Sequence, residues 1–152
     1  MRLIRFASAA AIVLIAGLPA AGQQPSSGSM NVCDRVPIAD VAAAVAGRAL
    51  EARPGDTRGL TTARCVYGLE IDGARRAIVL WTSDAGDYDD FRKSAANRVD
   101  VRDVGDEAFE TTDPDTKRVQ LTARRRGKLT VQVTADRSSW AQAVAKVALS
   151  KF

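Results

Sequence analysis

The feature that most restricts the fold is a single pair of cysteines, Cys33 and Cys65, in a chain of 152 residues without histidine. A redox motif would need Cys-x-x-Cys spacing, and a closed zinc site needs four ligands, which two cysteines without histidine do not readily supply. An even number of cysteines, 65 − 33 = 32 residues apart, instead favours a disulfide. In the chain-entropy description such a bridge stabilises the fold by about 3.5–4 kcal/mol.

The N-terminal segment has the three successive regions of a secretory signal peptide: charged, apolar and small-residue. Arg2 and Arg5 precede an apolar run over residues 6–16, and small residues follow at 20–22. A glycine and a proline interrupt the apolar run before it reaches the roughly 20 residues that span a bilayer, so retention as an anchor is the alternative interpretation. We expect residues 1–22 to be removed and the protein to be periplasmic or secreted, where disulfides persist.

We expect the remaining chain to form one domain. Residues 23–32 are polar and rich in serine and glycine, which predicts a flexible leader before a disulfide-braced domain over residues 33–152. Removal of the predicted signal peptide, with Arg2 and Arg5, lowers the formal charge from 22 − 18 = +4 to 20 − 18 = +2. Acidic residues are spread through the same segments and no basic stripe is interleaved with aromatics, so we do not expect a nucleic-acid partner.

Hydrophobic periodicity predicts three helices and two hairpins. The helices cover Pro37–Ala46, a segment that begins at Asp87, and Ser138 to about Lys151. Asp72-Gly73 predicts a two-residue hairpin loop between two apolar runs. In that register one face carries Cys65, Tyr67, Leu69, Ile71, Ile78 and Leu80.

A second hairpin is predicted across the three-residue loop Arg125-Arg126-Gly127, with Gly127 in the left-handed position. A loop with an odd number of residues keeps the apolar residues of the two strands opposite one another. The predicted pairs are Val119 with Val133, Leu121 with Val131, and Ala123 with Leu129. The reverse face of this hairpin is polar and should be solvated.

These elements form two similar halves, each a helix followed by a hairpin, with a closing C-terminal helix. Further short strands near Ala49–Arg53 and Ala108–Thr111 would complete them, and the spacing of the helix starts is compatible with a duplication. We therefore expect an α+β fold with a largely antiparallel sheet of four to six strands, covered by helices on one or both faces.

Several short motifs resemble a group of small exported bacterial domains that includes uncharacterised actinobacterial lipoproteins with two cysteines. They are Cys33 before a short helix, Cys65-Val66-Tyr67, Val104-Gly105-Asp106-Glu107-Ala108, Arg126-Gly127-Lys128-Leu129-Thr130-Val131 and the alanine-rich last helix. The resemblance covers about residues 33–152 and implies an α/β sandwich, similar to that of the oxygen-evolving-complex P subunit. The chain lacks the lipid-bearing cysteine of the lipoproteins, and the group transfers no catalytic residues.

Two surfaces are candidate binding sites. The polar face of the second hairpin could hold an anionic or polar ligand, or could simply be solvated. Its residues are Arg118, Gln120, Thr122, Arg124, Lys128, Thr130 and Gln132. The reverse of the first hairpin is apolar, and it marks a protein partner's site unless a helix covers it. It carries Val66, Ala77, Val79 and Trp81.

The absence of histidine excludes Ser–His–Asp and Cys–His catalysis within the chain and all histidine-ligated metal sites. We expect no metal, no cofactor and no catalytic residue, and hence a non-catalytic exported binding domain that contacts a protein or an envelope component. One alternative is a secreted hydrolase inhibitor that uses a loop such as Arg53–Gly59 or Asp113–Thr116. A carboxylate hydrolase based on Asp106 and Glu107 is the other.

The processed protein should have a defined mass. Cleavage after Ala21 or Gly22 and oxidation of both thiols predict an exported chain that begins at Gly22 or Gln23 and does not react with an alkylating agent until it is reduced. Intact-mass analysis of the exported protein before and after alkylation checks both points. A mass that still includes residues 1–22 contradicts the predicted cleavage. Two thiols that react with the alkylating agent in the native protein contradict the predicted disulfide.

Overall fold

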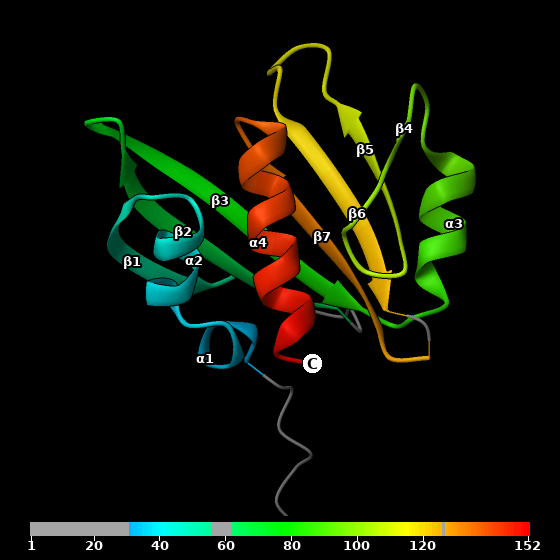
Figure 1. The fold of residues 1–152 in the computed structure, drawn as a ribbon, viewed down its shortest axis with the longest axis horizontal. Helices are drawn as coiled ribbons and strands as arrows, with labels where there is room; N and C mark the ends of the chain where they lie inside the picture. The colour runs from blue at the N-terminus through cyan, green and yellow to red at the C-terminus, as the bar shows by residue number, and fades with distance from the viewer. Residues whose placement is uncertain (1–30, 56–61, 126) are drawn as a thin grey trace, which may run out of the picture.

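The protein is a single seven-stranded antiparallel sheet with helices on both faces (Figure 1). The structure is a computed structural model and describes residues 31–55, 62–125 and 127–152. The predicted signal peptide, residues 23–30 of the leader, most of the Arg53–Gly59 loop and Arg126 lie outside the described residues. The strands lie in the order β1-β2-β3-β7-β6-β5-β4. Their bounds are β1 Arg48–Pro54, β2 Ala63–Ile71, β3 Ala74–Ser83, β4 Val99–Val101, β5 Glu107–Thr112, β6 Val119–Arg125 and β7 Leu129–Ala135.

Four described helices accompany the sheet: α1 Val32–Arg35, α2 Ile38–Ala44, α3 Asp87–Ser94 and α4 Ser138–Ser150. α1, α2 and α4 lie on one face, which we call the core face (Figure 1). α3 packs on the opposite face, the reverse face, because its Tyr88 contacts Phe109 and Arg124, whose side chains alternate with the core-face residues of β5 and β6. The predicted helix over Pro37–Ala46 is observed as α2, with Pro37 as its N-cap residue.

The first hairpin confirms the predicted register. Ile71 pairs with Ala74 across Asp72-Gly73, and Cys65 and Tyr67 pair with Leu80 and Ile78. Asp72 and Gly73 have φ values of 52° and 73°, as a type I′ turn requires at both central positions. The apolar side chains of β2 and β3 therefore share one face.

The second hairpin has the predicted loop length but a different register. Leu121 pairs with Val133 and Ala123 with Val131, so the register of one strand relative to the other is displaced by two residues, and the last pair before the loop is Arg125 with Leu129. Gly127 has the expected positive φ of 68°. A shift of two residues returns every side chain to the same face, and the hydrophobic alternation therefore cannot detect it.

The predicted number of strands, four to six, is too low, and the two halves are not equivalent. The first half supplies three strands, β1 to β3, and the second half supplies four, β4 to β7. The strand without a counterpart in the first half is β4, a short edge strand over Val99–Val101 that pairs with β5. α2 packs on the core face whereas α3 packs on the reverse face. The topology joins two antiparallel meanders of different size through the β3–β7 pairing.

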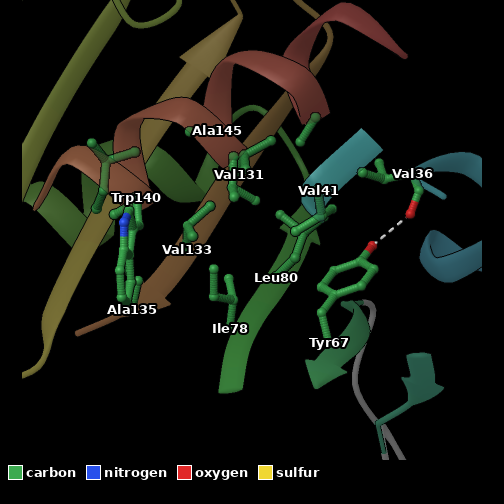
Figure 2. Packing of buried hydrophobic residues seen from close by; sticks show 14 of the residues in the cluster. Val36, Val41, Tyr67, Ile78, Leu80, Val131, Val133, Ala135, Trp140 and Ala145 are labelled. Carbon is green, nitrogen blue, oxygen red and sulfur yellow. Dashed lines mark hydrogen bonds between the residues drawn. The ribbon is translucent and has the colours of Figure 1, made fainter. Parts of the chain in front are cut away.

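The hydrophobic core fills the space between the core face and α4 (Figure 2). α4 buries Trp140, Val144 and four further residues against the middle of the sheet, where Leu80 and Val133 are fully buried. The single phenol in this layer, Tyr67, donates a hydrogen bond of 2.8 Å to the Val36 carbonyl oxygen (Figure 2). Burial raises the pKa of this phenol, so it remains a neutral donor.

The predicted disulfide is present and joins α1 to β2. The Cα atoms of Cys33 and Cys65 lie 5.3 Å apart. The Asn31 side chain caps α1 by accepting a hydrogen bond from the Cys33 backbone N–H, and Val32 is 1% exposed. The flexible leader predicted over residues 23–32 therefore extends too far, because Asn31 and Val32 belong to the folded domain. A disulfide of this kind is consistent with an oxidising compartment outside the cytoplasm.

Alanine substitutions at a buried and at an exposed leucine test the assignment of the hydrophobic core. Leu80 is fully buried whereas Leu50, on the edge strand β1, is 38% exposed. Leu80→Ala should lower the free energy of unfolding by about 2–5 kcal/mol, because it removes buried contacts and leaves a cavity. Leu50→Ala should change it by less than about 1 kcal/mol. Urea unfolding of both variants measures this difference, and equal losses would contradict the assigned core.

Candidate functional site

A groove on the reverse face is the candidate site, and the strand register builds its floor. Thr111, Gln120 and Thr134 are direct cross-strand neighbours on β5, β6 and β7. Phe109 pairs with Thr122, and Thr122 pairs with Gln132, in a second row parallel to the first. Side chains two residues apart on a strand point to the same face, so both rows face the same side of the sheet.

The walls of the groove come from α3 and from the β5–β6 loop. Phe91, Ser94, Ala95 and Ala96, in and just after the last turns of α3, line one side, and the loop around Pro114 lines the other. In Figure 1 α3 stands beside β4 and β5, and the loop rises above the ends of β5 and β6. The groove encloses about 680 Å³, which is within the range of small-molecule sites.

Asp113 organises the loop at the rim. Its carboxylate accepts hydrogen bonds from the backbone N–H groups of Thr116, at 2.7 Å, and Asp115, at 3.0 Å. These hydrogen bonds, that from Thr116 first, hold the pKa of Asp113 below its ordinary value. The charge of Asp113 is therefore used to fix the turn.

Arg118 is the other charged residue of the lining, and it also bonds within the protein. Its guanidinium donates to the Ala77 carbonyl oxygen at 2.6 Å, and its Nε lies 3.2 Å from an Asp136 carboxylate oxygen. The lining therefore carries one negative and one positive charge, and each of the two side chains already contacts other groups of the protein. The groove is close to neutral although the chain as a whole is basic.

The rest of the floor offers uncharged polar groups. Among the described residues, none hydrogen-bonds the Gln120 amide or the hydroxyls of Thr111 and Thr134. Gln120 is exposed, whereas the two threonines are half-buried. In the second row the Gln132 amide donates weakly to the Thr122 hydroxyl at 3.4 Å. The first row can therefore donate to and accept from a ligand.

Arg124 anchors α3 to the reverse face. Its guanidinium lies 4.5 Å from the centre of the Tyr88 ring, and it forms ion pairs with Glu107 at 2.6 Å and with Asp89 at 3.1 Å. Tyr88 also packs edge-on against Phe109, with ring centres 5.5 Å apart. One arginine on β6 therefore contacts two residues of the α3 first turn and holds the groove wall in place.

The structure brings together four of the predicted ligand residues: Arg118, Gln120, Thr122 and Gln132 all line the groove. Arg124, Thr130 and Lys128 do not line it. The expectation that this face is solvated is wrong at the α3 end, where Thr122 is 2% exposed and Thr130 is fully buried. α3 covers them, and Thr130 donates to the Ala85 carbonyl oxygen at 3.4 Å.

Sequence reasoning did not identify Phe91, Phe109, Thr111 or Thr134 as lining residues. The two-residue error in the second hairpin placed Gln120 opposite Gln132, whereas its neighbour is Thr134. The short runs that form β5 also left Phe109 unassigned to a face. Strand alternation contained the signal for Thr134, but nothing local indicated that α3 crosses to the reverse face.

The apolar patch predicted as a partner site lies beside the groove. Thr134 and Gln132 pair with Val79 and Trp81 on β3, so the two floor rows continue into the patch. α3 packs on β6 and not on this patch. The Arg64 guanidinium lies 4.7 Å from the centre of the Trp81 ring. Val66 and Trp81 are half-buried, and Val79 is buried.

The carboxylates considered for hydrolysis line a different depression. Asp106 and Glu107 border it with Tyr88, Arg92 and Asp100. Glu107 is held by Arg124, and a hydrogen bond from Arg92 keeps the pKa of Asp100 below its ordinary value. A general acid needs a raised carboxyl pKa, which Asp100 does not have.

Across the described ranges, no group of three or more histidine, cysteine, aspartate or glutamate residues is arranged to hold a metal ion. Within the same ranges no helix is both long enough and apolar enough to cross a membrane. Comparisons with known protein families, with curated proteins and with solved structures find no match to this chain.

Arg124 supplies a direct test of the groove wall. Arg124→Met should lower the free energy of unfolding by about 1–3 kcal/mol, because the ring stacking and the charge-assisted hydrogen bonds are lost. Amide exchange in α3 should rise at the same time. Arg48→Met, which removes an exposed ion pair with Glu70, is the matched control and should cost at most about 1 kcal/mol. Equal costs with unchanged exchange in α3 contradict the anchor.

Proposed function

We propose that the protein is a non-catalytic exported binding domain that contacts an envelope component or a protein through the reverse-face groove. The observation that supports this most directly is the row formed by Thr111, Gln120 and Thr134. These side chains hydrogen-bond no other described residue and face a groove whose two charged residues are already engaged. Polar groups that converge on a preformed concave surface are typical of ligand sites.

A periplasmic or secreted location is part of the proposal. The Cys33–Cys65 bridge supports it, since such bridges persist in oxidising compartments. The signal-peptide order of residues 1–22 and the resemblance to small exported bacterial domains stay predictions that fit the same location.

An inhibitor function is a second candidate, favoured by the geometry of the β5–β6 loop. Besides the two hydrogen bonds to Asp113, Lys117 donates through Nζ to the Pro114 carbonyl oxygen at 2.6 Å. Residues 112–117 are exposed. A preformed exposed loop loses little conformational entropy when it binds, which is what an inhibitory loop requires.

Immobilised mature protein tests the binding function. Envelope and secreted fractions from the producing cells are passed over the wild-type domain and three variants. Gln120→Arg places a bulky cation in the groove and should reduce saturable retention by about tenfold or more. Trp81→Thr, in the adjoining patch, and Lys128→Ala, on the exposed hairpin tip, should retain the component as the wild type does.

The same experiment separates the alternatives. Loss of retention in Trp81→Thr but not in Gln120→Arg moves the site to the apolar patch and contradicts the groove. A retained hydrolase whose activity is suppressed, and restored by Pro114→Gly with Asp115→Ala, favours inhibition. Turnover that disappears in Asp106→Asn or Glu107→Gln would establish an enzyme instead.

A further inference from the structure

We infer that the ligand of the reverse-face groove is a neutral oligosaccharide. The inference rests on the proposed binding function and names the chemical class of the ligand. It depends on three observations: the charge of the lining, the arrangement of its free polar groups, and the kind of surface that forms the floor.

The charge of the lining selects an uncharged ligand. Among the described residues that line the groove, Asp113 and Arg118 alone are charged, and their opposite charges leave the lining without a net formal charge. A phosphate or carboxylate ligand would need a cation to offset its desolvation, and the Arg118 charge is already offset by the Asp136 carboxylate, 3.2 Å from its Nε, while Asp113 in the same lining repels an anion. A cationic ligand would be repelled by Arg118 in the same way, and the Asp113 Oδ1 atom already accepts two hydrogen bonds from the turn.

The free polar groups suit a ligand that carries many hydroxyls. Thr111, Gln120 and Thr134 lie side by side on three adjacent strands, which are about 4.8 Å apart in a sheet, so the three side chains form a row across the floor. Hydroxyls donate and accept, and the planar amide of Gln120 does both in one plane. An amide can therefore bridge two neighbouring hydroxyls of a sugar ring, each of which also donates and accepts.

The walls suit the less polar faces of sugar rings. Phe91 is half-buried on the α3 side, with Ala95 beside it, and Pro114 stands on the loop side. Sugar rings present patches of C–H groups above and below the ring, and these pack well on aromatic rings. Apolar walls above a polar floor therefore match both kinds of sugar surface, and the enclosed volume leaves room for more than one ring.

The floor is a poor receptor for an extended peptide. Peptides that bind sheets usually add a strand to a free edge, where backbone N–H and C=O groups are unpaired. β6 and β7 are paired on both sides, so their backbone groups are already used. Only side chains are available in this groove, and they offer no repeated backbone pattern.

Amide NMR spectra of the mature domain test the inference. The probes are neutral hexasaccharides of glucose, mannose and N-acetylglucosamine, an acidic oligogalacturonate, and an uncharged extended hexapeptide. We expect at least one neutral saccharide to cause saturable shifts at the amides of Thr111, Gln120 and Thr134. Gln120→Leu should weaken that binding about tenfold or more, and Thr134→Val about threefold to tenfold. Lys128→Ala is the control and should bind as the wild type does.

The outcomes separate this inference from the proposed function. Binding of the hexapeptide at these amides, without any saccharide, overturns the oligosaccharide and leaves a binding groove. Tighter binding of the oligogalacturonate than of every neutral saccharide also overturns it. No shift from any probe, while Gln120→Arg still abolishes retention of an envelope component, overturns the ligand class alone. A spectrum of each variant that matches the wild type outside the groove shows that a loss of binding is not a loss of folding.

Discussion

The groove depends on one interaction, the placement of Arg124 between the Tyr88 ring and the carboxylates of Glu107 and Asp89. On β6 and β7 the reverse face beside α3 carries mainly threonine and glutamine side chains, which offer a helix little apolar surface to bury. Tyr88 and Phe109 supply a small apolar contact, and the arginine adds stacking and charge-assisted hydrogen bonds in a largely buried position. Because α3 is fixed there, the polar rows beside it become a floor with a wall.

The core face carries most of the buried apolar side chains, and the proposed binding site lies on the other face. The core face buries the long apolar side chains against α1, α2 and α4, and the disulfide ties α1 to β2. The reverse face beyond α3 carries threonine and glutamine side chains, which add little to the core. Substitutions in the floor should therefore be tolerated by the fold, which is what a surface free to specialise in ligand binding requires.

Local chemistry predicted the parts of the fold that depend on nearest neighbours. Asp72-Gly73 determines both the turn and the register of the first hairpin, and the spacing of the two cysteines indicated the bridge. Alternation determined which face each residue of β6 and β7 occupies but not their relative shift, because a displacement of two residues preserves the face. The side on which α3 packs depends on contacts between Tyr88 and residues of β5 and β6, which no local pattern contains. The polar side chains that β6 and β7 contribute to the floor were therefore predictable from the sequence, whereas the wall formed by α3 was not.

If partners bind in the groove between α3 and the β5–β6 loop, they should protect its backbone amides. Hydrogen–deuterium exchange of the mature domain, alone and with the envelope fraction that it retains, measures this protection. We expect slower exchange in residues 91–96 and 111–120, with β1 and the β2–β3 hairpin unchanged. Protection confined to residues 64–81 or to the β1 edge would contradict it.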